Sequence, residues 1–140
     1  ALTLAQQLRA HSIQLPNEII LISPWVDVSM QNVEISQYDP HDPILSIQGL
    51  LESAQAYAGP LSLTDPLVSP LYGSLNHLPP ISIFIGTHDI LYPDAIKLSK
   101  KLLNILLTLN MKNVYNQTRT VFFSHKHAKI TQKECSRKFN

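Results

Sequence analysis

The chain has 140 residues, of which 44% are hydrophobic and 15% are charged, and its formal net charge is +1 at pH 7. This length and composition suffice for one globular domain with a sizeable core. The single cysteine, Cys135, excludes an internal disulfide, and no apolar run approaches the roughly 20 residues of a membrane-spanning helix. Because no charged and then apolar leader opens the chain, we expect a cytoplasmic protein and interpret Ala1 as a truncation point.

The first half of the sequence predicts two helices and one strand. Apolar residues at helical spacing predict a helix over residues 1–10, and the β-branched run at 18–23 predicts a strand. After a stretch rich in proline and aspartate, Ser46 is a suitable N-cap for a helix that Gly59 stops. Residues 60–80 are rich in proline and lack periodicity, so they predict an ordered loop over the sheet.

The second half predicts a strand, a loop that carries an acid, a helix and a further short strand. The apolar run at 81–86 ends in glycine, Asp89 follows three residues later, and a helix is predicted over 93–110. The last strand is expected at 112–115. Helices alternate with strands in this order, which predicts right-handed crossovers in a parallel sheet.

The charge is divided unevenly along the chain. Residues 1–115 hold five basic and nine acidic side chains, a formal charge of −4, whereas residues 116–140 hold six basic and one acidic, a charge of +5. The composition changes at the same place. We therefore expect a domain over 1–115 and a basic, poorly ordered tail over 116–140, such as an altered or frame-shifted reading frame produces.

Four segments carry a family resemblance, and they occur in the order ALTLAQQLR at 1–9, SPWVD at 23–27, DPLVSPLYG at 65–73 and ISIFIGTHDILYPD at 81–94. They resemble parts of the esterases related to hormone-sensitive lipase: the helix after the nucleophile elbow, the S-P-W-x-D loop, the segment before the acid strand, and the acid-bearing loop. The resemblance implies an α/β fold, the carboxyl-terminal part of an α/β hydrolase with parallel strands, flanking helices and an incomplete sheet. The G-D-S-A-G-G elbow of the family would then lie upstream of Ala1.

This family transfers acyl groups through a serine, a histidine base, an orienting acid and backbone donors for the oxyanion. The resemblance implies that Asp89 is the acid, whereas Asp94, inside the predicted helix start, is interpreted as a partner of the helix dipole. For the base it suggests His125, with His127 as the alternate. Neither histidine is followed by the aromatic residue of the family, and a histidine in a basic tail is usually only solvated.

The catalytic set is incomplete, because no G-x-S-x-G or H-G-G-G run occurs in the chain. The resemblance therefore implies part of a carboxylic-ester hydrolase for small-molecule esters that needs no cofactor or metal and is inactive by itself. The alternative is a non-catalytic binding domain on the same scaffold. Nucleic-acid binding is not expected from the tail, and self-association is expected if the strand at 18–23 is an exposed edge.

Two residues of the SPWVD segment leave their role open. Trp25 and Asp27 follow the carboxyl end of a predicted strand, where they could line an acyl pocket. They could equally anchor the loop through a partly buried indole, and we favour this second interpretation.

Overall fold

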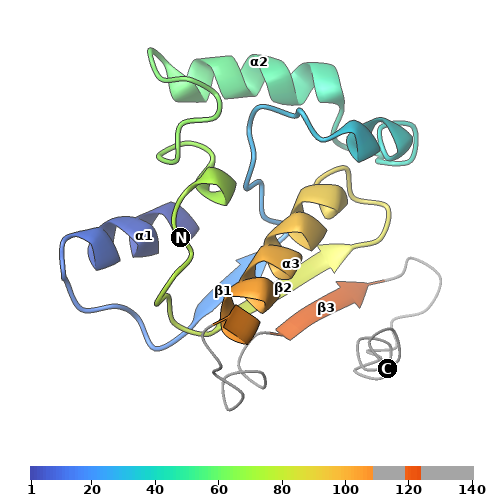
Figure 1. Ribbon diagram of the computed structural model, residues 1–140. Coiled ribbons are helices and arrows are strands. Elements are labelled where there is room, and N and C mark those ends of the chain that lie inside the picture. Colours follow the sequence, from blue (N-terminus) through green and yellow to red (C-terminus); the bar gives the residue numbers. More distant parts are fainter. Residues whose placement is uncertain (109–118, 124–140) are drawn as a thin grey trace.

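The computed structural model describes residues 1–108 and 119–123 of the chain, with side chains through residue 105 (Figure 1). Its helices and strands, in chain order, are α1 (Leu2–Ala10), β1 (Ile19–Ile22), α2 (Ile47–Ala58), β2 (Ile81–Gly86), α3 (Tyr92–Thr108) and β3 (Arg119–Phe123), with short 3-10 turns at η1 (Val33–Gln37) and η2 (Pro70–Tyr72). Within this described part, no helix combines the length and the apolar character that crossing a membrane requires.

The three strands form one parallel sheet in the order β1-β2-β3. Ile19 pairs with Ile81, and at the far end of β2 Gly86 pairs with Phe123. The strands predicted at 18–23 and 81–86 are therefore confirmed.

The structure has a third strand, β3 at 119–123, that was not predicted from the sequence. The strand expected at 112–115 lies outside the described residues and stays a prediction. The run Thr-Val-Phe-Phe at 120–123 is more β-branched and aromatic than the residues before it, and such side chains favour strands. The sheet therefore includes residues of the predicted tail, up to residue 123. For the residues beyond 123, a poorly ordered tail stays a prediction.

One face of the sheet carries the core. Ile19 and Leu21 are buried and lie in register with Ile81 and Ile83, so their side chains share a face. Helices α1 and α3 both pack there, and the buried side chains that they contribute to this core are Leu2, Ala5, Ala95, Leu98 and Leu102. The core-facing helix predicted from about residue 93 is confirmed.

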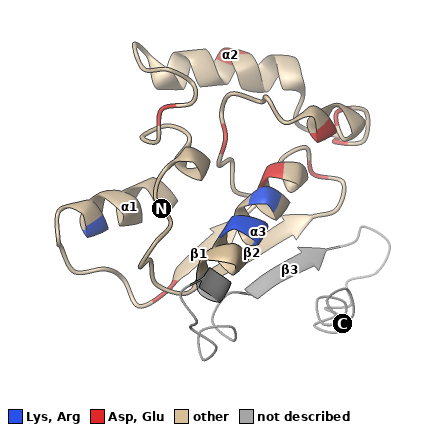
Figure 2. Cartoon of the chain, in the orientation of Figure 1, with Lys and Arg blue, Asp and Glu red and all other residues tan. Residues whose placement is uncertain are grey.

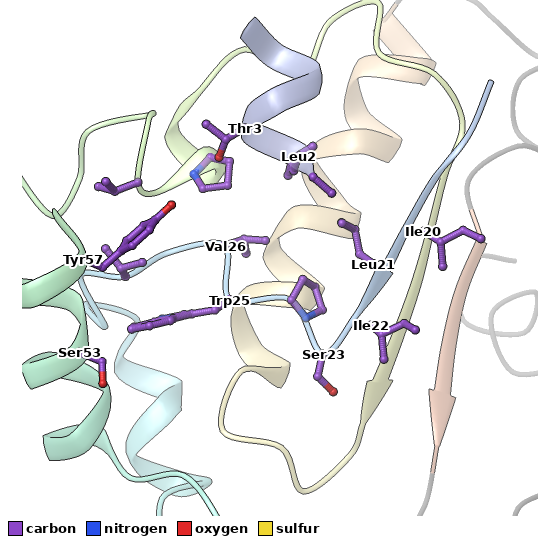
Figure 3. A pocket seen from close by; sticks show the side chains of 15 residues that line it. Leu2, Thr3, Ile20, Leu21, Ile22, Ser23, Trp25, Val26, Ser53 and Tyr57 are labelled. Carbon is purple, nitrogen blue, oxygen red and sulfur yellow. The ribbon is translucent and has the colours of Figure 1, made fainter. Parts of the chain in front are cut away.

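The other face of β1 is exposed. Ile20 and Ile22 alternate with the buried residues and keep 58% and 76% of their surfaces exposed. Figure 3 shows Leu21 on the side of α1, with Ile20 and Ile22 on the opposite side of the strand. An exposed apolar face on a parallel strand is unusual, because parallel sheets are normally covered on both sides.

The ends of α2 follow the sequence signals. The Ser46 hydroxyl accepts a hydrogen bond from the Gly49 N–H at 3.2 Å, so Ser46 caps the helix as predicted. Gly59 ends the helix with a φ of +56°, a conformation that glycine adopts without steric cost.

The proline-rich segment at 60–80 is ordered, and hydrogen bonds connect it to the loop after β1 and to helices α1 and α3. Leu71 donates its N–H to the carbonyl of Val26 at 3.0 Å, and the Lys101 ammonium of α3 donates to the carbonyl of Leu71 at 3.0 Å. From α1, the buried Gln6 amide donates to the carbonyl of Pro70 at 2.9 Å. This loop therefore closes one end of the core.

The contact between Gln6 and the loop generates a stability prediction. A Cβ at Gly73 would lie 2.7 Å from Gln6 Nε2, so Gly73→Ala must displace the Gln6 amide. This displacement leaves the Pro70 carbonyl without its donor, and we expect a loss of about 1–3 kcal/mol in the free energy of unfolding. In a Gln6→Ala background the same change should cost much less. Equal costs in the two backgrounds, measured by urea unfolding in a double-mutant cycle, would contradict this account.

Candidate active site

Asp89 lies in the turn that joins the carboxyl end of β2 to the start of α3. Its N–H donates to the carbonyl of Gly86 at 3.2 Å, and its own carbonyl accepts from Tyr92 N–H at 2.9 Å. The half-buried carboxylate also accepts from Leu91 N–H through Oδ1 at 2.8 Å. Open α/β sheets place their chemistry at this edge, so Asp89 stands where the sequence predicted.

Asp42 holds this turn from a loop 48 residues earlier in the chain. Its Oδ2 accepts a hydrogen bond from Ile90 N–H at 2.9 Å. Its Oδ1 accepts from Ile44 N–H and Leu45 N–H, each at 2.9 Å. One carboxylate therefore orders its own loop and connects that loop to the residue directly after Asp89.

The pKa of Asp42 reflects these contacts. Partial burial raises the pKa, but the three N–H groups, from Leu45, Ile90 and Ile44, lower it by more. Its pKa consequently lies below the ordinary value of an aspartate. The charged form is the one that holds the turn.

Asp27 anchors the loop after β1. It is fully buried, and its Oδ1 accepts from both the N–H and the hydroxyl of Ser29. Its Oδ2 accepts from the Tyr72 hydroxyl at 2.8 Å. A buried carboxylate whose oxygens all accept hydrogen bonds from the protein is a structural anchor. Asp27 also does not line the cavity at the carboxyl end of β1.

Asp94 is a second buried carboxylate and lies in the first turn of α3, with 2% of its surface exposed. Its Oδ1 accepts from Asn32 Nδ2 at 2.8 Å, and Oδ2 has no partner among the described residues. Burial raises its pKa; the Asn32 hydrogen bond and the Lys97 charge lower it, whereas the Asp27 charge raises it further. Figure 2 shows this acidic first turn beside the basic residues of α3. This burial favours an anchoring role for Asp94 over a catalytic one.

A cavity of about 590 Å³ lies at the carboxyl end of β1, between the strand and the helices α1 and α2 (Figure 3). Its wall includes Leu2, Thr3, Ser23, Trp25, Ser53 and Tyr57. Trp25 is half-buried and faces this space, whereas Asp89 is not one of the lining residues. Of the two roles considered for the SPWVD segment, Trp25 lines a cavity and Asp27 anchors the loop.

The two candidate histidines lie outside the residues that the structure describes. His125 and His127 both fall in the range 124–140, which the structure does not describe, so their role stays a prediction. Among the residues that are described, no group of three or more histidine, cysteine, aspartate or glutamate side chains could hold a metal ion.

Sequence reasoning missed Asp42, Asn32 and Tyr72. Asp42 belongs to the run Asp-Pro-His-Asp-Pro, and an aspartate near a proline is a common turn signal. That signal predicts its contacts with residues 44 and 45. Nothing in the local sequence indicates the contact with Ile90.

The comparisons with known proteins agree with this geometry. Residues 1–118 match the family described as alpha/beta hydrolase fold. The chain is 38% identical over 98 residues to a triacylglycerol lipase of Mycobacterium tuberculosis, covering 70% of this chain and 18% of the lipase. It is 31% identical over 102 residues to an esterase of Acinetobacter venetianus, covering 72% of this chain and 34% of the esterase.

A solved structure supports the same fold. A hormone-sensitive lipase from a metagenome library superposes with a TM-score of 0.72 at 20% identity, over 87% of this chain and 37% of the lipase. The chain therefore belongs to the α/β-hydrolase family, and the fold class inferred from the sequence is confirmed. It spans about a third or less of the length of the two curated relatives it matches.

Asp42 generates a prediction about stability and pH. Asp42→Asn keeps one acceptor but places an amide donor against a backbone N–H, so we expect a loss of about 1–3 kcal/mol in the free energy of unfolding at pH 7. A carboxylate with a lowered pKa stabilises the fold above the unfolded pKa of about 3.9 and loses this effect as the pH falls through the folded pKa. The difference between wild type and variant should therefore shrink below about pH 4.

The matched control is Asp65→Asn. Asp65 Oδ1 accepts a single backbone hydrogen bond, from Leu67 N–H in an exposed turn, and asparagine can accept the same bond. We expect this change to stay within about 0.5 kcal/mol of wild type in urea unfolding. An Asp42→Asn variant as stable as the control, or a difference that is the same at pH 7 and pH 3.5, would contradict the role of Asp42.

Proposed function

We propose that this chain supplies the acid of a Ser-His-Asp triad to a carboxylic-ester hydrolase, and that the acid is Asp89. The observation that carries the proposal is the position of Asp89 in an ordered turn at the carboxyl end of β2, tied down by Asp42 through Ile90. Membership of the α/β-hydrolase family and similarity to an esterase and a lipase support an ester as substrate.

In this mechanism each part has one role. The Asp89 carboxylate accepts a hydrogen bond from an imidazole N–H, orients the ring and stabilises the imidazolium that forms. The imidazole takes the proton of a serine hydroxyl as the serine oxygen attacks the ester carbonyl, and the imidazolium then gives this proton to the leaving alcohol, so that an acyl-serine remains. Water, deprotonated by the same imidazole, hydrolyses the acyl-serine, releases the acid and restores the serine hydroxyl. Backbone N–H donors stabilise the oxyanion. The serine and these donors come from outside the 140 residues, because the chain has neither G-x-S-x-G nor H-G-G-G.

His125 is the base that we propose, and the sheet register supports it. Gly86, the last residue of β2, pairs with Phe123, the last residue of β3. In a parallel sheet the carboxyl ends of paired strands meet at one edge. Along the sequence, Asp89 follows Gly86 by three residues and His125 follows Phe123 by two. This short separation from paired strand ends supports His125 as the base.

The first test is the activity of the chain alone. Because the nucleophile and the oxyanion donors are proposed to lie elsewhere, the purified 140-residue chain should hydrolyse p-nitrophenyl butyrate no faster than a control protein without serine. Saturable turnover that persists through repurification and disappears in Asp89→Asn would contradict the proposed division of the site.

The role of Asp89 is tested in a chimera. The matched 102-residue segment of the Acinetobacter venetianus esterase is replaced by the corresponding residues of this chain. Asp89→Asn can still accept the hydrogen bond of Leu91, so the turn is preserved, and kcat should fall about 10⁴-fold. Asp65→Asn is the control and should leave kcat unchanged. A chimera in which both variants are equally active would rule out Asp89 as the acid.

His125 requires a second chimera that continues through residue 140 of this chain. His125→Ala should abolish hydrolysis there, and His127→Ala should reduce it little. The reverse result would assign the base to His127. If instead the first chimera, which keeps the histidine of the host esterase, unfolds cooperatively but hydrolyses nothing, the result would favour a binding domain on a hydrolase scaffold.

A further inference from the structure

Residues 32–42, which include η1, run beside the acid-bearing turn and the first turn of α3 in the opposite chain direction (Figure 1). We call this segment the strap. Three contacts join the two segments in this reversed order: Asn32 with Asp94, Tyr38 with Tyr92, and Asp42 with Ile90. The last of these contacts lies directly beside Asp89, so the strap touches the turn at the residue after the proposed acid.

The middle contact is an aromatic stack. The rings of Tyr38 and Tyr92 lie 5.6 Å apart between centroids, with an interplanar angle of 29°. Both side chains are partly buried and pack against the main hydrophobic core. Stacked aromatic pairs at such distances contribute more than the burial of their surface alone. Because Tyr92 N–H donates to the carbonyl of Asp89 at 2.9 Å, the ring that Tyr38 holds belongs to the residue that closes the turn.

Tyr38 also orders the end of the strap that carries Asp42. Its carbonyl accepts from His41 N–H at 2.8 Å and from Asp42 N–H at 3.1 Å. The His41 ring meets the His88 ring edge-on, with centroids 6.4 Å apart and planes at 79°. Asp89 therefore lies between two residues, 88 and 90, that both contact the strap.

The strap is itself fixed to the core. Ile35 keeps only 1% of its surface exposed and belongs to the main core cluster. Its N–H donates to the carbonyl of Asn32 at 3.0 Å, and its carbonyl accepts from Tyr38 N–H at 2.9 Å. Since Ile35 lies between the first and second contacts, the position of Tyr38 is set by the core and not by the turn alone.

We propose that Tyr38 is a positioning residue for Asp89. Its ring holds Tyr92 and its carbonyl holds Asp42, and these two residues fix the turn that presents the acid. The proposal rests on the proposed function, in which the Asp89 carboxylate orients an imidazole. Such a carboxylate acts through its position, and a displacement of about 1 Å can lower a rate about 100-fold.

The first measurement needs no catalysis and uses the 140-residue chain. Tyr38→Leu keeps an apolar side chain but removes the ring, so the turn should open more often. Relative to the amides of β2, the amides of Ile90 and Leu91 should exchange at least about tenfold faster than in wild type. Tyr38→Phe keeps the ring and should restore the wild-type ratio. The matched control is Leu63→Ala, which truncates a partly buried residue of the second core cluster and should leave this ratio unchanged.

The second measurement uses the first esterase chimera. Tyr38→Leu should lower kcat about 10- to 100-fold and change KM by less than about twofold, because the acid is displaced while the substrate contacts remain. Tyr38→Phe should recover kcat. Leu63→Ala should leave kcat, referred to folded enzyme, as it was. A side chain that only stabilises the fold would lower the amount of folded enzyme and not its kcat.

The outcomes separate the two proposals. Circular dichroism checks that each variant folds, and if Tyr38→Leu does not, Tyr38→Met takes its place, because methionine adapts to irregular space. An unchanged exchange ratio in this variant would overturn the positioning role. So would faster exchange with an unchanged kcat, in a chimera that Asp89→Asn inactivates. Faster exchange in a chimera that stays fully active with Asp89→Asn would support the hold of Tyr38 on the turn and contradict only the proposed function.

Discussion

The hydrogen bonds that Asp42 accepts are the constraint on which the candidate site depends. The turn after β2 has local hydrogen bonds between Gly86 and Leu91, and the side chains of Ile90 and Leu91 are buried in the core. Asp42 adds a long-range contact at Ile90 and uses the same carboxylate to order residues 44 and 45. Because the acceptor is charged, these hydrogen bonds are stronger than those between neutral groups. The sheet fixes where the turn begins, and Asp42 fixes its continuation.

Two buried carboxylates, Asp27 and Asp94, hold the loop that follows β1. Asp27 is satisfied by Ser29 and Tyr72, whereas Asp94 has one unpartnered oxygen and a raised pKa. A carboxylate whose folded pKa is raised lowers stability as the pH rises through that value, the opposite of the effect of Asp42. Removing a partner from a buried charge is costly, so this network holds the loop after β1 against α3 and resists separation.

Local patterns in the sequence predicted most of the fold. The run at 81–86, the N-cap at Ser46 and the helical spacing after residue 93 all follow rules that act within a few residues, and each is confirmed. The strand at 119–123 was missed because its residues were assigned to the tail by charge, although they are β-branched and aromatic. Asp89 was located by a motif at a strand end. The contact between Asp42 and Ile90 could not be predicted, because it joins residues 48 positions apart and depends on how two loops pack.

The most direct test of the central claim is amide hydrogen exchange at Ile90 and Leu91 in the isolated 140-residue chain at pH 7. The claim is that this chain builds the acid-bearing turn by itself, with both amides donating to carboxylates of Asp42 and Asp89. Both amides should exchange at least about 100-fold more slowly than in an unfolded chain, and we expect similar protection for the amides of β2. Exchange at the unfolded rate in these two amides, with β2 still protected, would show that the turn is not formed and would contradict the account.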